Sequence, residues 1–294
     1  MNLTQCLQEF FDDDQIEITL QAVHGGDIHQ SAMIQLVSGN SAPKKLFVKT
    51  NAISAYEVLK SEYDSLKAID DVFSGVYPKP ILFKSLEDKV ILLMTFHEIS
   101  SFNKRFSAEA GRLLAQQHRI VHNKFGWFAD NFIGLTPQSN QWKENWVEFF
   151  REQRLLPMLK MAITNGLDKH SAQQVEQLLD NLDMILNHDI VPSLVHGDLW
   201  SGNLGVDMGI KQPIFFDPAP YYGDREVDLA MTELFGRLPA DFYQHYNSAY
   251  PIQEGYEQRK HVYNLYHALN HVVLFGSGYL GLVAACLKGD SSAL

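Results

Sequence analysis

Three polar side chains in the second half of the chain have the types and spacing of a phosphoryl-transfer site. Asp198 and Asn203 lie five residues apart in the run SLVHGDLWSGN, and Asp217 ends the apolar run PIFFD. Phosphoryl transfer from ATP needs a carboxylate that orients the attacking hydroxyl and metal ions on the phosphates. Mg²⁺ prefers one or two carboxylates together with phosphate and water oxygens. The spacing therefore predicts Asp198 as the base and Asn203 and Asp217 as metal ligands. The alternative is a chance loop beside an Asp that only ends a strand.

Two charged residues of the first hundred could complete such a site. Lys49 ends a strand-like run, and Glu62 follows in a helical pattern, where Glu57 is a rival. A lysine here would contact the α- and β-phosphates, and a glutamate would hold the lysine in place. A glycine pair, Gly25 and Gly26, separates the first two strand-like runs, as a phosphate cover or as a plain hairpin turn. The parts occur in kinase order, which favours the kinase interpretation.

Other polar residues allow two interpretations each. Asp228 could accept backbone N–H bonds from the Asp198 loop or only favour a helix start. His196 is expected as a packed, hydrogen-bonded strut. The pairs His118/His122 and His267/His271 have zinc-binding i, i+4 spacing, but without an HExxH glutamate packing is favoured over zinc.

The hydrophobic periods predict an α+β chain with a mainly β part at residues 1–97 and a mainly α part at 98–294. Alternation of apolar residues predicts strands in the first part, around one helix. The expected elements of the first part are a helix at 2–11, strands at 16–23, 31–37, 45–50, 76–83 and 90–96, and the helix at 54–69. In the second part, helical patterns are found at 107–122, 142–166, 171–187, 226–237 and through 240–287, where 271–287 is expected to be a buried helix.

Composition excludes several classes of protein. The 294 residues carry a formal charge of −11, so no basic surface can neutralise nucleic-acid phosphates. The two cysteines lie near opposite ends of the chain, which indicates a reducing compartment. No secretory signal is found at the start, and the most apolar stretch is short and interrupted by glycines. We expect a cytoplasmic protein that binds neither nucleic acid nor membrane and is a monomer or a homodimer.

The octet HGDLWSGN resembles the signature of the fructosamine kinase (ketosamine 3-kinase) family, a branch of the protein-kinase-like fold with the aminoglycoside phosphotransferases and choline kinases. Further similar stretches are GGDIHQS, LFVKTN, NKFGWFADNFIGLTPQSNQW, IFFDPAPYYGDREVDLAM and YNLYHALNH, so the resemblance covers nearly the whole chain. It implies a two-lobed fold, the cofactors ATP and Mg²⁺, and phosphorylation of small-molecule or protein-bound ketosamines at the third carbon's hydroxyl, which leads to deglycation.

The resemblance also implies roles for individual residues. Asp198 would accept the sugar hydroxyl proton, and Asn203 and Asp217 would hold magnesium. The residues implied in nucleotide binding are Gly25, Gly26, Asp27, Ile28, Lys49, Glu62 and the hinge Met94, Thr95 and Phe96. Trp146 and Trp200 could stack on a sugar, although core packing is the default for both. The alternatives are a kinase of aminoglycosides or choline, and a nucleotide-binding pseudokinase.

Overall fold

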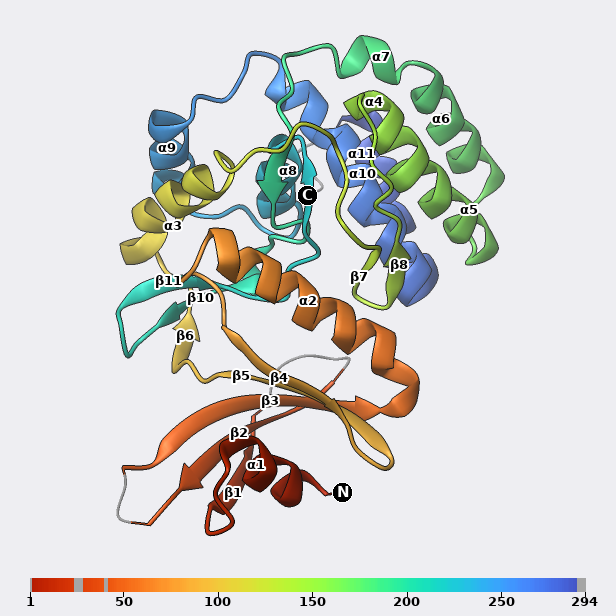
Figure 1. Cartoon of the computed structure of the whole chain (residues 1–294). Coiled ribbons are helices and arrows are strands. Elements are labelled where there is room, and N and C mark those ends of the chain that lie inside the picture. The colour runs from red at the N-terminus through yellow and green to blue at the C-terminus, as the bar shows by residue number, and fades with distance from the viewer. Residues whose placement is uncertain (1, 24–28, 40–41, 290–294) are drawn as a thin grey trace. The chain divides into compact units, whose positions relative to one another are not determined.

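The structure is a computed structural model that describes residues 2–23, 29–39 and 42–289. The glycine loop with Gly25, Gly26, Asp27 and Ile28 lies outside these residues. The chain forms two compact units, 1–99 with 207–211, and 100–206 with 212–289 and the terminal residues (Figure 1). The short segment 207–211 thus belongs with the first unit, although a division at residue 97 would assign it to the second.

The first unit is built on one antiparallel sheet of five strands in the order β1-β2-β3-β5-β4. Its sequence alternates apolar and polar residues, as the prediction of strands in this part requires. The elements are α1 (Leu3–Phe11), β1 (Glu17–Ala22), β2 (Gln30–Val37), β3 (Lys44–Ala52), η1 (Ile53–Ala55), α2 (Tyr56–Val72), β4 (Pro80–Ser85) and β5 (Lys89–Thr95).

The two faces of this sheet carry different helices. Leu46 and Val48 of β3 join an apolar cluster that includes Leu7 of α1. Because side chains alternate along a strand, Lys49 points to the opposite face. Helix α2 packs there, against β4 and β5 (Figure 1). The strand register therefore turns Lys49 toward the helix that carries Glu62.

The second unit is mainly helical. Its short strands form small sheets in the orders β11-β10-β6, β12-β9 and β7-β8. The helices are α3 (Lys104–Gln117), α4 (Trp146–Phe149), η2 (Phe150–Leu155), α5 (Leu156–Thr164), α6 (Lys169–Asp180), α7 (Leu182–Ile185), η3 (Ser201–Asn203), α8 (Glu226–Leu234), α9 (Ala240–Ala249), α10 (Tyr256–Phe275), η4 (Gly276–Tyr279) and α11 (Leu280–Lys288). The strands are β6 (Ile99–Ser101), β7 (Asn131–Ile133), β8 (Thr136–Gln138), β9 (Ser193–Val195), β10 (Leu204–Asp207), β11 (Gln212–Phe215) and β12 (Tyr221–Gly223).

The core of the second unit surrounds α8 and α10, which pack against each other. Every residue of α8 is buried, including its acids, and most of α10 is buried as well. Their buried charges pair between the helices, with Arg259 on Glu226 and Lys260 on Glu233. These pairs leave no uncompensated charge among them, as burial of ions demands.

Two predicted helices have different boundaries in the structure. The run 142–166 is divided, because a π-helical segment, η2, precedes α5. Pro157 has no N–H for the carbonyl of Gln153, and the Arg154 guanidinium donates to that carbonyl instead, at 2.9 Å. Helix α3 ends at Gln117, so His118 and His122 are not on one helix face.

The predicted buried helix at 271–287 is also wrong in detail. Helix α10 ends at Phe275, and Gly276 has a positive φ of 81° that interrupts the helical path. In α11 only Val283, Ala285 and Cys286 are buried. By length and composition alone the stretch Tyr256–Lys288 could cross a membrane. A core helix of a soluble protein meets the same criteria, and 33% of the most apolar window of this stretch is buried.

Candidate functional site

The loop after β9 is held against the segment that contains Asp217. The amide of Phe216 donates to the carbonyl of Asn203 at 3.1 Å, and the amide of Ala219 donates to the carbonyl of His196 at 2.9 Å. Gly197 has a φ of 82°, and a Cβ there would lie 2.0 Å from the carbonyl oxygen of Ala219. Only glycine permits this turn and this close approach.

A buried carboxylate on α8 anchors the same loop. Asp228 accepts hydrogen bonds from the amides of His196 (2.6 Å) and Gly197 (2.9 Å) and from Nε2 of His118 (3.0 Å). Burial opposes ionisation of this carboxyl, but the hydrogen bond and charge of His118 lower its pKa on balance. The first interpretation of Asp228, a support for the loop, is confirmed.

His196 is the strut that its apolar setting predicted. Its Nε2 donates to the carbonyl of Phe216 at 3.0 Å, and its Nδ1 accepts from the amide of Asp198 at 3.1 Å. The ring is fully buried, and burial lowers its pKa. Both ring nitrogens therefore bind backbone groups and hold the backbone of Asp198 in place.

Asp198 lies in a partly buried and electronegative place. Its side chain is 22% exposed. Burial and the nearby charge of Asp217 raise its pKa to about 7, with a smaller contribution from Asp228, while the hydrogen bond from Asn203 opposes them. A carboxyl group with a pKa near 7 is poised to accept a proton at neutral pH.

Asn203 and Asp217 offer oxygen atoms suited to a divalent cation. The Asn203 amide donates its Nδ2 to the carbonyl of Asp198 at 2.9 Å and to its Oδ2 at 3.3 Å. That orientation leaves the Asn203 Oδ1 to coordinate a metal. Asp217 is exposed after β11 and has a φ of 53°, a backbone strain often retained at functional sites. An amide oxygen and a carboxylate fit the preference of Mg²⁺.

The first unit contains the predicted lysine–glutamate pair. Nζ of Lys49 lies 2.7 Å from Oε1 of Glu62, and both side chains are nearly buried, at 11% and 13% exposed. Glu57, the rival, is exposed on α2. The structure therefore brings Lys49 and Glu62 together and leaves Glu57 out.

The predicted hinge occupies the end of β5. Met94 is buried in the strand, and Phe96 follows it outside the regular sheet. The amide of Thr95 donates to the carbonyl of Lys79 at 3.0 Å, and its hydroxyl contacts the His97 ring. The Thr95 N–H is thus already used within this unit, which the sequence did not indicate.

The histidine pairs do not form zinc sites. His118 uses Nε2 on Asp228 and Nδ1 on the hydroxyl of Tyr246 at 2.8 Å. His122 stacks on Trp142 with ring centroids 4.4 Å apart. His271 donates through Nδ1 to the carbonyl of His267 at 2.9 Å. Packing and local hydrogen bonds account for His118, His122 and His271, as the favoured interpretation predicted.

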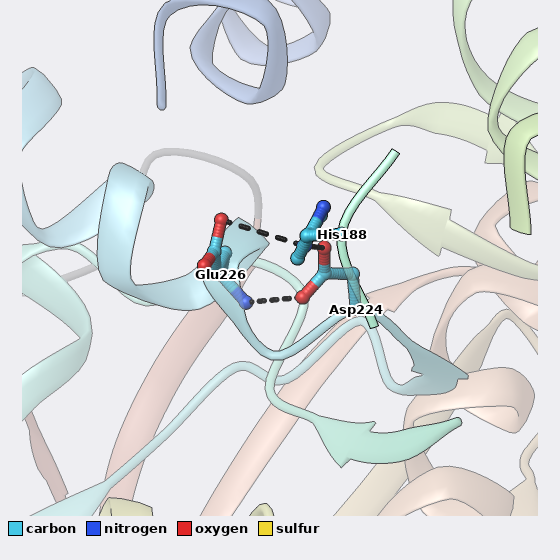
Figure 2. A group of neighbouring side chains, drawn as sticks. All are labelled: His188, Asp224 and Glu226. Carbon is cyan, nitrogen blue, oxygen red and sulfur yellow. Dashed lines mark hydrogen bonds and ion pairs between the residues drawn. The ribbon is translucent and has the colours of Figure 1, made fainter. Parts of the chain in front are cut away.

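Another group in the second unit has metal-binding residue types, namely His188, Asp224 and Glu226 (Figure 2). Asp224 accepts from Nε2 of His188 (2.7 Å) and from the hydroxyl of Tyr263 (2.5 Å). Glu226 is bound by two guanidinium nitrogens of Arg259, at 2.7 and 2.8 Å. The Asp224 carboxylate is thus bound by a histidine and a hydroxyl, and the Glu226 carboxylate by a guanidinium. We therefore interpret the group as a buried support for the start of α8 and not as a metal site.

Sequence reasoning missed a set of buried amide side chains that donate hydrogen bonds to the backbone just after Asp217. Asn131 donates to the carbonyl of Pro220 at 2.9 Å, and Gln138 donates to that of Ala219 at 3.2 Å. Asn140 in turn donates to Asn131. All three amide side chains are buried. Their only sequence signal is the clustering of amides between residues 131 and 140.

Sequence reasoning also missed a row of aromatic rings beside the loop. Trp200 is 37% exposed and contacts Phe235, with ring centroids 6.0 Å apart. Phe235 contacts His271 at 4.6 Å, and His271 contacts Tyr279 at 4.9 Å. Core packing, the default expected for both Trp residues, holds for Trp146, which is 2% exposed, and is wrong for Trp200.

Comparison with known protein families and relatives agrees with this geometry. A model of the family described as fructosamine kinase matches residues 1–289. A Synechocystis protein named a probable ketoamine kinase is 41% identical over 91% of this chain and 88% of its own length. A chloroplastic protein-ribulosamine 3-kinase of Arabidopsis thaliana is 36% identical over 88% and 78%. The ketosamine-3-kinase of Mus musculus is 33% identical over 81% and 85%.

Solved structures show the same fold. A Haemophilus somnus protein described as a candidate fructosamine-3-kinase has a TM-score of 0.84 and 27% identity, with 97% of this chain and 95% of that one covered. A choline kinase of Streptococcus pneumoniae has a TM-score of 0.65 at 13% identity, covering 98% of both chains. An aminoglycoside phosphotransferase has a TM-score of 0.60 at 16% identity, covering 97% and 98%. The last two show the protein-kinase-like fold alone.

Proposed function

The chain belongs to the fructosamine kinase family, and we therefore propose that it transfers the γ-phosphoryl group of ATP to the 3-hydroxyl of a ketosamine. The observation that carries the proposal is the loop geometry. Asp198, with its raised pKa, lies beside the amide of Asn203 in a loop anchored by Asp228. The relatives named for ketoamines, ribulosamines and ketosamines supply the acceptor class.

In the proposed reaction Asp198 accepts the proton of the acceptor hydroxyl. The hydroxyl oxygen forms a bond to the γ-phosphorus as the bond to the β,γ-bridging oxygen breaks, so ADP leaves with the electron pair of that bond. Lys49, fixed by Glu62 at 2.7 Å, offsets negative charge on the nucleotide phosphates. The hydrogen bonds of Asp228 and His196 hold the base in place, so that little reorganisation is needed at reaction.

Asn203 and Asp217 are the residues that would hold magnesium. Their fit rests on the orientation of the Asn203 amide, whose nitrogen is bound to Asp198, and on the exposed carboxylate of Asp217. Mg²⁺, when bound, would neutralise charge on the phosphate oxygens. We propose Met94 to Phe96 as the adenine-reading segment, through groups other than the Thr95 N–H, and the glycine loop as the phosphate cover.

The aromatic row suits a sugar acceptor. Trp200 and Phe235 form an edge-to-face pair at the loop, and binding sites for small molecules are commonly lined by aromatic side chains with few polar groups. Trp146 is buried, so only Trp200 of the two proposed tryptophans is placed to stack on a sugar. The acceptor is therefore expected to lie over Trp200 with one hydroxyl at Asp198.

The alternatives are less well supported. Kinases of choline and aminoglycosides share the fold at 13% and 16% identity, which says nothing of the acceptor. A pseudokinase would need neither an intact Lys49–Glu62 pair nor an intact set of Asp198, Asn203 and Asp217, and this chain has both. We further propose a deglycation role and, as for the sequence prediction, a cytoplasmic location.

The experiment is a measurement of ADP release with ATP and Mg²⁺ against a panel of a fructosamine, a ribulosamine, an aminoglycoside and choline. We expect turnover on the ketosamines, with phosphorus coupled to the proton on C3 in NMR spectra of the product. Turnover on the aminoglycoside or choline alone would overturn the acceptor. Nucleotide binding without turnover on any acceptor would favour the pseudokinase.

A further inference from the structure

A buried histidine of α10 faces the proposed base. Nδ1 of His267 lies 3.9 Å from Oδ1 of Asp198, the carboxylate oxygen farther from the Asn203 amide. The histidine is 4% exposed, so its ring is fixed in the core of the second unit. Helix α10 and the loop are 69 residues apart in the sequence, and only the fold brings them together.

The Nδ1 atom of this ring is buried and makes no hydrogen bond. Two other fully buried histidines of the unit have partners for both nitrogens. His118 is bound to Asp228 and Tyr246, and His196 is bound to Phe216 and Asp198. A buried polar atom without a partner costs about 1–3 kcal/mol, and native proteins retain few of them. Nδ1 of His188 also has no hydrogen bond, so His267 is distinguished by the place of its atom, which faces the Asp198 carboxylate.

We propose that His267 is a positioning residue whose Nδ1–H donates to Oδ1 of Asp198 and turns Oδ2 toward the acceptor hydroxyl during the proposed reaction. The inference rests on the proposed role of Asp198 as base. A gap of 3.9 Å exceeds a hydrogen bond, but catalytic hydrogen bonds are often long without substrate and shorten in the reacting complex. The proposal requires the Asp198 side chain to rotate toward His267 until Nδ1 and Oδ1 are within hydrogen-bond distance.

The charge of the ring fits this role. Burial and the neighbouring His271 lower the pKa of His267 to about 3, so the imidazole is neutral and has one N–H. A lone pair at Nδ1 would face the negative carboxylate, whereas an N–H there is attracted to it. The carboxylate thus selects the tautomer with hydrogen on Nδ1. The ring then adds a neutral donor without a competing positive charge.

The matched test uses two side chains of the same branched shape. His267→Asn keeps an N–H donor close to the position of Nδ1, and His267→Leu removes it. We expect the leucine variant to lower kcat about tenfold or more with KM for ATP and acceptor within about twofold, and the asparagine variant to recover most of the loss. His170→Asn, on an exposed residue of α6, is the control and should leave kcat unchanged.

Equal losses in the two variants, a loss confined to KM, or full activity of the leucine variant would overturn the proposal. If the leucine variant does not fold, ¹⁵N NMR of the wild-type histidine rings decides the matter. A protonated Nδ1 on His267 supports the proposal, and a protonated Nε2 with bare Nδ1 contradicts it. This spectrum is independent of the acceptor. A wild type inactive on ketosamines would contradict the proposed function while leaving the tautomer measurable.

Discussion

Replacement of Asp198 by asparagine should slow turnover by orders of magnitude and yet stabilise the protein at alkaline pH. In the metal-free protein, burial and the charge of Asp217 raise the pKa of Asp198 to about 7, against about 3.9 in an unfolded chain. A carboxyl whose pKa is raised on folding contributes stability that is complete below the unfolded pKa and lost as pH rises through the folded one. The stability of D198N relative to wild type should therefore increase from about pH 4 to about pH 7 and stay constant above it.

The size of the effect follows from the shift. A shift of about 3 pH units corresponds to about 4 kcal/mol at 1.36 kcal/mol per unit. Because 22% of the side chain is exposed, solvent screening reduces this value, and we expect about 2 kcal/mol. A domain of this size gains roughly 2 °C in Tm per kcal/mol, so D198N should melt about 4 °C higher than wild type at about pH 8.

The assay is thermal unfolding followed by circular dichroism with EDTA, from about pH 5 to about pH 8.5. Asp228→Asn is the matched control, since Asp228 has a lowered pKa and accepts from three donors. It should destabilise the protein at neutral pH by about 3 kcal/mol, a loss that stays nearly constant across this pH range and shrinks only as the pH falls below the unfolded pKa of about 3.9. If D198N is less stable than wild type at about pH 8, or if its difference does not vary with pH, the reasoning about the loop electrostatics is wrong.

Three further predictions concern the other parts of the site. Lys49→Met should lower kcat/KM for ATP about a hundredfold in steady-state assays. The control Glu57→Gln, on an exposed residue, should leave kcat/KM unchanged. Equal effects of the two substitutions would contradict a specific role of Lys49. Asp217→Asn should raise the Mg²⁺ concentration needed for half-maximal rate at least about tenfold. Its Tm should change little, because asparagine tolerates the positive φ at this position. An unchanged magnesium titration would refute the ligand role. Gly197→Ala should lower the stability by about 3 kcal/mol or more in urea unfolding, since its Cβ would meet the Ala219 carbonyl at 2.0 Å, and a variant of wild-type stability would contradict that geometry.

The sequence allowed prediction of the parts of the site that are local in the chain. The five-residue step from Asp198 to Asn203 keeps their contact within one loop, and the alternation of β3 directs Lys49 to the face where α2 lies. The rivalry of Glu57 and Glu62 could not be settled from the helical pattern alone. It depends on how α2 is rotated on the sheet, which is a tertiary property.

The parts that could not be predicted depend on contacts between distant segments. His267 lies 69 residues from Asp198, the residue that its Nδ1 faces. Asn131 lies 89 residues from Pro220, whose carbonyl accepts its hydrogen bond. The division of the 142–166 run depends on the Arg154 guanidinium, which takes the carbonyl that a regular helix would use. The exposure of Trp200 depends on the turn of the loop, while Trp146 has the same residue type and is buried. Residue type and spacing do not encode such differences.

The central claim is that Asp198 accepts the proton of a ketosamine hydroxyl during transfer from ATP. Its most direct test is the rate of ADP release by wild type and D198N with a fructosamine, ATP and Mg²⁺ at saturation. We predict turnover by the wild type and a kcat about 10² to 10⁴ times lower for D198N, with KM for ATP changed less than about twofold. A D198N enzyme that turns over a ketosamine at nearly the wild-type rate would contradict the claim.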